Sequence, residues 1–156
     1  MTDIATGDNL QEKILRLEEQ ILQLPQVDVP MMHWIEGDTY YRAILVRKGI
    51  TITGARHRFP HECICIGDIL VSTDIGVTRL QGYTRLWAEG GKKRVGSAVE
   101  DTIWLTKHWT NRNSLEGMDE WLTFPDEHEA LALVRDRRNS CALQASNVPQ
   151  LSGTGT

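Results

Sequence analysis

Two histidines stand four residues apart in the stretch TGARHRFPHECICIGD, which covers residues 53–68. Neutral imidazole is the commonest metal ligand in proteins, so His57 and His61 are candidates to bind a metal ion. They could equally be hydrogen-bonded polar residues at the edge of a strand. Pro60 lies between them and indicates a bend in the chain. The spacing alone therefore leaves two interpretations open, a metal site and a strand edge.

A second candidate for chemistry is the basic sequence GGKKR at residues 90–94. Arginine can hold a phosphate or a carboxylate through two parallel hydrogen bonds, and adjacent glycines let the backbone approach such a group. The spacing does not match a Walker motif, and a run of this kind is often a solvated turn. Lys92, Lys93 and Arg94 are therefore candidate residues for binding a small anion.

The elements that must position these residues begin with a helix. We expect disorder over residues 1–8 and an amphipathic helix over residues 9–25, ended by Pro25. Its apolar stripe must be covered either by its own domain or by a second chain in a two-stranded coil. The stripe has the helical spacing of four, three, four and three, and consists of Leu10, Ile14, Leu17, Ile21 and Leu24.

Residues 26–112 have the period of two that is typical of strands. Many short candidate strands follow one another, separated by turn residues such as Gly67-Asp68, Gly82 and Gly90-Gly91. This spacing predicts an antiparallel sandwich or barrel, for example a jelly roll. Beyond it we expect a loop and a C-terminal helix over residues 113–139, and a flexible tail over residues 140–156.

Composition restricts the classes of partner. The chain has 156 residues, a formal net charge of −4 and three cysteines. This charge argues against general binding to nucleic acid or to an anionic membrane, because both require a cationic surface. An odd number of cysteines favours reduced thiols over a disulfide framework. No stretch has the pattern of a secretory signal or a membrane span, so we expect a protein that is not secreted.

Residues 20–112 resemble the cupin family, whose barrels carry two short motifs. The sequence KGITITGARHRFPHECICIGD has the form of the first motif, with Gly49 at its start and Gly67 at its end. The sequence WAEGGKKRVGSA has the form of the second. More narrowly, the chain is similar to small cupin-like proteins encoded by tailed bacteriophages and prophages. The resemblance implies an all-β core, a cupin-like double-stranded β-helix (jelly-roll barrel) with flanking N-terminal and C-terminal helices.

The resemblance also implies a site inside the barrel, where cupins bring imidazoles and a carboxylate together on a metal. His57 falls close to the second histidine of the first motif, and His61 close to its glutamate. A third ligand would come from His108 or Glu62. His57, His61 and His108 are therefore the candidate ligands for a divalent metal such as Fe, Mn, Ni or Zn. Arg94 takes the position of a motif histidine and favours an anion over a cation there.

Three interpretations of this region remain open. In the first, the histidines are only structural, and Arg94 pairs with Glu62, Glu89 or Glu100. In the second, His57, His61 and His108 hold a metal. In the third, a pocket binds an anionic ligand through the residues Arg94, Lys92, Lys93, His57 and His61.

For function, the resemblance favours a phage-encoded accessory or virion-associated protein that works by binding and not by turnover. We expect a homo-oligomer whose partner is another phage or host protein, or a small anionic ligand in the barrel. We expect it in the host-cell cytoplasm or in the phage particle. The alternatives are a metal-dependent cupin enzyme of the isomerase or dioxygenase type, and a sponge for a nucleotide-like signal.

Overall fold

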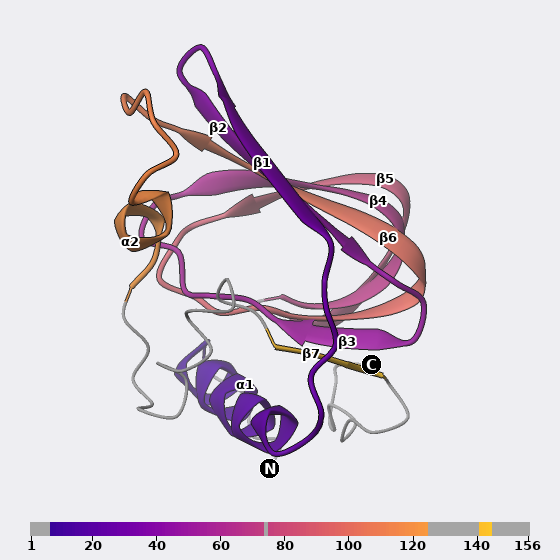
Figure 1. The fold of residues 1–156 in the computed structure, drawn as a ribbon. Helices are drawn as coiled ribbons and strands as arrows, with labels where there is room; N and C mark the ends of the chain where they lie inside the picture. The colour runs from indigo at the N-terminus through magenta and orange to yellow at the C-terminus, as the bar shows by residue number, and fades with distance from the viewer. Residues whose placement is uncertain (1–6, 74, 125–140, 145–156) are drawn as a thin grey trace.

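A computed structural model describes residues 7–73, 75–124 and 141–144 of the chain. The described part is a curled antiparallel β-sheet with one long helix beneath it (Figure 1). No helix in these residues is both long and apolar enough to cross a membrane. The elements in chain order are α1 (Gly7–Leu22), β1 (Met31–Glu36), β2 (Thr39–Val46), β3 (Ile50–Thr53), β4 (His61–Thr73), β5 (Gly76–Ala88), β6 (Val95–Trp109), α2 (Met118–Leu122) and β7 (Cys141–Gln144).

The strand β6 is the centre of the sheet. Its C-terminal half pairs with β2, its N-terminal end pairs with β3, and β4 runs along its other side. The strand β1 extends the sheet beyond β2, β5 extends it beyond β4, and β7 pairs with β3. Because β4, β5 and β6 are long and curved, they contribute to two facing layers (Figure 1). The core is therefore a mostly antiparallel β-barrel of the jelly-roll type, and the fold class predicted from the sequence is confirmed.

Three of the observed strands, β4, β5 and β6, are longer than the short strands that the sequence predicted. Gly67-Asp68 was interpreted as a turn, but it lies inside β4, which continues for 13 residues. The register between β4 and β6 shifts at this point, which marks a β-bulge. Gly67 has φ +147°, and a Cβ atom there would lie 2.5 Å from Thr102 Oγ1. The glycine therefore allows the strand to bend around the barrel without ending.

The helix α1 is covered by its own chain. Ile14, Leu17 and Ile21 are buried, and the last two pack against Val95 at the start of β6. The helix lies beneath the layer that contains β3 (Figure 1). Of the two expected ways to cover the apolar stripe, the structure thus shows packing within one domain. The helix also begins and ends two to three residues earlier than the sequence indicated.

The helix expected near residues 125–139 lies outside the described residues, so it stays a prediction. The described helix α2 is a single short turn at Met118–Leu122, inside the segment that was expected as a loop. The expected flexible tail contains the strand β7, which pairs with β3 through four residues. Met118 and Leu122 of α2 pack on the fully buried Tyr40, so α2 closes the barrel beside the C-terminal end of β6.

Candidate functional site

His57 lies in the loop between β3 and β4, and backbone contacts to the segment after α2 hold it. It forms an isolated bridge with Thr123, and the flanking bonds are Arg58 N–H to Leu122 O at 2.6 Å and Phe124 N–H to Arg56 O at 2.8 Å. On the other side, Gly91 N–H donates to His57 O at 2.7 Å. The bend expected at Pro60 is present, and it separates His57 from the strand that follows.

The other two histidines lie on neighbouring strands. His61 is the first residue of β4 and His108 is the second-last residue of β6. Nδ1 of His61 lies 3.0 Å from Phe59 O. Because a carbonyl only accepts, this nitrogen carries the proton in the neutral ring, and Nε2 keeps its lone pair. His108 is 1% exposed, and no hydrogen-bond partner for its Nδ1 exists among the described residues.

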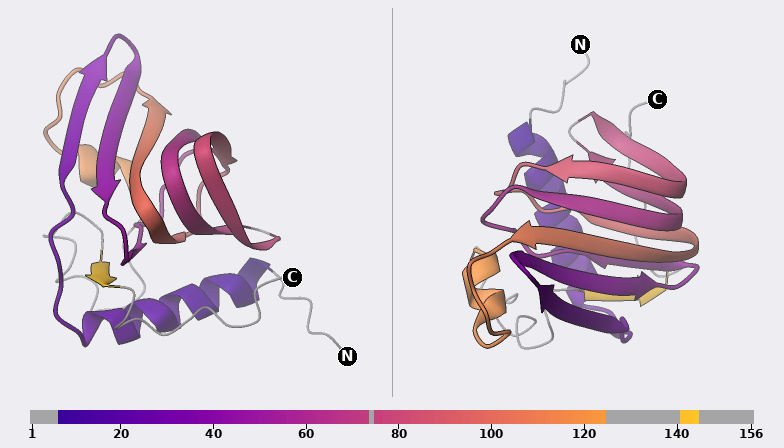
Figure 2. Two further views of the ribbon diagram at one scale, coloured as in Figure 1. Left: turned by 90° about the vertical axis from the view of Figure 1, so that its right-hand side faces the viewer. Right: turned by 90° about the horizontal axis from the view of Figure 1, so that it is seen from above.

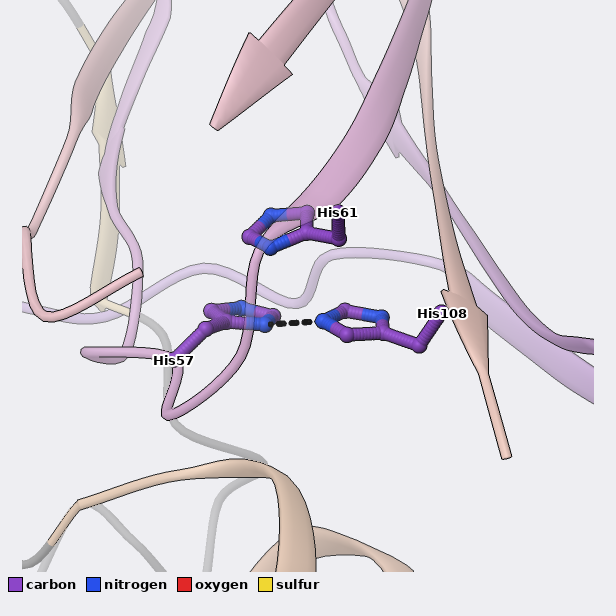
Figure 3. A group of neighbouring side chains, drawn as sticks. All are labelled: His57, His61 and His108. Atoms are coloured by element: carbon purple, nitrogen blue, oxygen red, sulfur yellow. Dashed lines mark hydrogen bonds between the residues drawn. The ribbon is translucent and has the colours of Figure 1, made fainter. Parts of the chain in front are cut away.

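The three imidazoles form one compact cluster, which we call the histidine cluster (Figure 3). His57 Nδ1 and His108 Nε2 share a hydrogen bond of 3.0 Å. The ring of His61 lies over the other two, with centroids 4.5 Å from His57 and 4.2 Å from His108. The structure therefore brings together all three histidines that were predicted as metal ligands.

All three rings are held in the neutral form. Burial lowers the pKa of His57 well below its usual value, and the charges of His61, His108, Arg42 and Arg94 lower it further. Burial, followed by the charges of His61 and Arg42, lowers the pKa of His108 to about 3. Burial also lowers the pKa of His61, with Arg94 acting in the same direction. At neutral pH the cluster thus offers lone pairs and no positive charge.

The donor chemistry of the cluster fits a transition metal. One nitrogen of each ring lies within 4.8 Å of the others, and the orphaned Nδ1 of His108 is a buried atom that lacks a partner in this part of the chain. An ion about 2.1 Å from each nitrogen requires them to be within about 4.2 Å of one another. The rings are also nearly parallel, at 8° to 28°. The cluster could hold a metal ion, but its rings must turn and close by several tenths of an ångström.

A cavity of about 670 Å³ opens beside the cluster inside the barrel. His57 and His61 line it, whereas His108 does not. Apolar side chains form much of the remaining wall, and the cationic Arg42 and Arg94 also reach it. Among the apolar residues that line the cavity are Ile44, Ile52, Ile69 and Val71.

Arg94 is a half-buried cation in this cavity. Its Nη2 makes a long contact of 3.4 Å to Trp87 O, and no carboxylate among the described residues forms an ion pair with it. Its charge nevertheless acts on both His57 and His61. Arg94 thus lines the same cavity as His57 and His61, and its guanidinium has hydrogen-bonding capacity left for an anion.

The expected pairing of Arg94 with Glu62, Glu89 or Glu100 is wrong for the described residues. Glu62 lies on the outer side of β4 and pairs with Arg85 and Lys107. This position also excludes Glu62 as the third metal ligand. Glu100 pairs with Lys48. Glu89 is exposed at the edge of the cavity and makes no ion pair with Arg94.

The two lysines of the basic cluster take different positions. Lys92 is exposed at the edge of the cavity. Lys93 is 2% exposed, and its Nζ lies 2.7 Å from a carboxylate oxygen of the equally buried Glu18 on α1. Gln11 adds two hydrogen bonds to the backbone N–H and carbonyl of Lys93. Lys93 thereby ties α1 to the loop that carries Arg94, a structural contact that the sequence did not predict.

Sequence reasoning missed Arg42 of β2. Its guanidinium pairs with Asp119 of α2 and donates from Nε to the hydroxyl of Tyr40 at 3.2 Å. It is a second cation beside the histidine cluster, already neutralised by a carboxylate. A register signal was present, because Tyr40 pairs with His108 across the sheet, but the position of Asp119 depends on tertiary packing.

Comparisons with known proteins find similar solved structures but no similar sequence. No known family of sequences and no curated protein matches this chain. Similar solved structures include a cupin-2 domain protein from Rhodospirillum rubrum, with 18% identity over 73% of this chain and 76% of that chain and a TM-score of 0.49. Ectoine synthase from P. lautus has 12% identity over 82% and 85%, with a TM-score of 0.48.

A third similar structure is a cupin superfamily protein from Desulfitobacterium hafniense, with 12% identity over 56% of this chain and 83% of that chain and a TM-score of 0.47. The structural neighbours are thus cupin superfamily proteins. At these scores the likeness carries no argument about activity. None of the three is described as a phage protein, so the narrower resemblance stays a prediction.

Proposed function

We propose that the protein binds a small organic anion inside its barrel, with Arg94 as the group that recognises the negative charge. The observation that carries this proposal is a half-buried guanidinium that lines a cavity without a carboxylate partner in the described part of the chain. A cation that is taken partly out of water without a counter-ion destabilises the fold. A bound carboxylate or phosphate removes this penalty, and it can use both edges of the guanidinium fork.

The walls of the cavity indicate the rest of the ligand. Ile44, Ile52, Ile69 and Val71 offer no hydrogen bonds, so they favour an apolar body. The neutral rings of His57 and His61 line the same cavity as Arg94, and each can donate or accept one hydrogen bond. A ligand with an anionic head, a neighbouring hydroxyl or carbonyl, and an apolar remainder matches this combination.

Thermal unfolding in the presence of anions tests the proposal. The panel contains phosphate, a nucleoside monophosphate, a short dicarboxylate and an aromatic carboxylate. We expect at least one organic anion to raise the melting temperature, because a ligand at 100 times its Kd adds about 2.7 kcal/mol of stability. Arg94→Ala should abolish the increase. The exposed Arg16→Ala on α1 is the matched control and should leave it unchanged.

The result also separates the alternatives. A shift with the nucleoside monophosphate alone would favour the sponge for a nucleotide-like signal. An equal shift for Arg94→Ala and for the original protein, or no shift with any anion, would contradict binding at Arg94.

The histidine cluster supports a second candidate, a metal-dependent enzyme of the isomerase or dioxygenase type. His57, His61 and His108 would hold a divalent Fe, Mn, Ni or Zn ion, which when bound would polarise an oxygen of the substrate. Arg42 and Arg94 oppose this binding, because both place positive charge near His57. An anion on Arg94 would relieve the repulsion, so metal and anion should bind more tightly together than alone.

Metal analysis of the purified protein tests this candidate. An enzyme of this type should contain about one metal ion per chain, and His57→Ala and His61→Ala should each lose it. His33→Ala is a control outside the cluster. Metal-free protein that also fails to bind added Zn²⁺, Mn²⁺ or Ni²⁺ in the presence of a binding anion would contradict the candidate.

The biological setting belongs to the proposal as well. A phage-encoded accessory or virion-associated protein, in the host-cell cytoplasm or the particle, is supported by the resemblance of residues 20–112 to such proteins. Neighbouring genes test it. A position among capsid and tail genes would support a virion protein, and a position in a bacterial metabolic operon would contradict it.

A further inference from the structure

The outer side of the five strands β1, β2, β6, β4 and β5 is unusually apolar. Their register places outward-facing residues in three rows across the sheet, which together we call the outer face. The first row is Tyr83, Ile66, Ile103 and Leu45; the second is Arg85, Ile64, Leu105, Ala43 and Met32; and the third is Trp87, Glu62, Lys107, Tyr41 and Trp34.

None of the described elements covers this face. Figure 2 (right) shows the five strands side by side, with α1 behind them. Large side chains remain in contact with solvent: Tyr83 and Met32 are 63% exposed, Trp87 60%, Ile66 48% and Ile103 45%. At about 200 Å² per large side chain, these five alone expose roughly 550 Å². This is near the upper end of the largest apolar patch on a typical monomer, roughly 300–600 Å².

The composition of the face fits a protein partner. Aromatic residues and arginine are enriched in interfaces, and the stacked rings of Trp34 and Tyr41, 5.1 Å apart, form a rigid surface. The charges nearly cancel, because Glu62 lies between Arg85 and Lys107 and pairs with both. A face with this small net charge attracts neither nucleic acid nor an anionic membrane, and it does not strongly repel a copy of itself.

We propose that the outer face is the contact between two copies of this chain. In a two-fold dimer the same surface meets itself, so a patch that is apolar at its centre and nearly neutral at its rim is self-complementary. The half-buried members of the rows, such as Ile64 and Leu105, bring the available area towards the ~800 Å² that each partner contributes to a standard interface. Ile66 and Ile103 face each other across β4 and β6 in the first row, where both are exposed within the proposed contact.

Sedimentation velocity of the full chain at micromolar concentration tests this inference. The original protein should sediment as a dimer. Ile66→Arg places an unpaired charge inside the contact and should give a monomer, with at least a tenfold weaker association. Ile75→Arg makes the same substitution at an isoleucine that is 87% exposed outside the outer face, and it should remain a dimer. Ile103→Arg changes the neighbouring residue of the same row and replaces Ile66→Arg if that variant does not fold, as judged by circular dichroism.

Two results would overturn the inference. One is an original protein that is monomeric at 50 to 100 micromolar. The other is a dimer that survives both Ile66→Arg and Ile103→Arg with native circular dichroism, because its contact would then lie elsewhere. The ligand proposed for Arg94 is not needed for either outcome, so this test is independent of the proposed function.

Discussion

The neutral state of the three histidines is the most consequential property at the level of single residues. Burial would destabilise an imidazolium at each position, and the positive charges of Arg42 and Arg94 act in the same direction on His57. The cluster can therefore hydrogen-bond a ligand or donate a lone pair to a metal, but it cannot itself supply positive charge at pH 7. This task falls to Arg94.

The lowered pKa values predict how stability depends on pH. The unfolded histidines titrate near pH 6.5, and His108 in the folded protein has a pKa of about 3. Between these values the unfolded chain binds more protons, so stability falls as the pH drops below about 6.5. The loss is at most about 1.4 kcal/mol per pH unit for each histidine that stays neutral.

Urea unfolding at pH 7.5, 6.0 and 5.0 measures this dependence, because most carboxylates are still ionised over this range. His108→Gln, although less stable at pH 7.5, should show a shallower decline because one of the three coupled groups is gone. A decline of equal slope in both proteins would contradict the assignment of a strongly lowered pKa to His108.

At the level of elements, the helix α1 fastens the loop that carries Arg94. Glu18 forms an ion pair with Lys93, Gln11 binds the backbone of the same residue, and Leu17 and Ile21 pack on Val95. These contacts lie on both sides of Arg94 in the sequence, so α1 sets the position of its backbone. The apolar stripe of the helix was readable from the sequence. The buried ion pair was not, because nothing local links residues 18 and 93.

Substitution of Glu18 should test this connection. Glu18→Ala removes the carboxylate from the buried ammonium of Lys93, and we expect a loss of roughly 3–5 kcal/mol in the free energy of unfolding. The double variant Glu18→Leu with Lys93→Met should recover most of it, because it removes both charges. Glu12→Ala changes an exposed glutamate on the same helix and should alter stability by less than about 0.5 kcal/mol. Similar losses in Glu12→Ala and Glu18→Ala would argue against a special role of the buried pair.

At the level of the whole molecule, strand periodicity predicted an antiparallel sandwich or barrel. The resemblance to cupins narrowed this to a jelly roll, and it grouped the three histidines as one of three open interpretations of the site. The strand boundaries were less predictable. Gly67 is a residue type that is common in turns, but in the structure it lies at a β-bulge within β4. The partner of Arg94 was predicted incorrectly, because the outward direction of Glu62 depends on the register with β5 and β6. The position of Arg42 beside the histidine cluster was not predicted, because its ion pair joins residues 42 and 119, which are distant in the chain.

The same register explains the two sides of the sheet. Inward residues of β4 such as Cys63, Cys65 and Ile69 are buried, and burial raises the pKa of the two thiols to about 11 and about 12, which keeps them protonated and unreactive. Outward residues of the same strand, Ile64 and Ile66, belong to the outer face. One strand thus supplies both the wall of the cavity and the proposed contact between copies.

Binding of an anion by Arg94 is tested most directly by an NMR titration that follows the Nε–Hε resonances of individual arginines while an organic anion is added. We expect the Arg94 resonance to move along a saturable curve, together with ring resonances of His57 and His61. Arg79, which is bound to Asp68 on the outside by two hydrogen bonds of 2.9 and 2.7 Å, should not move. An anion that raises the melting temperature and leaves the Arg94 resonance in place would contradict recognition of the anion by Arg94.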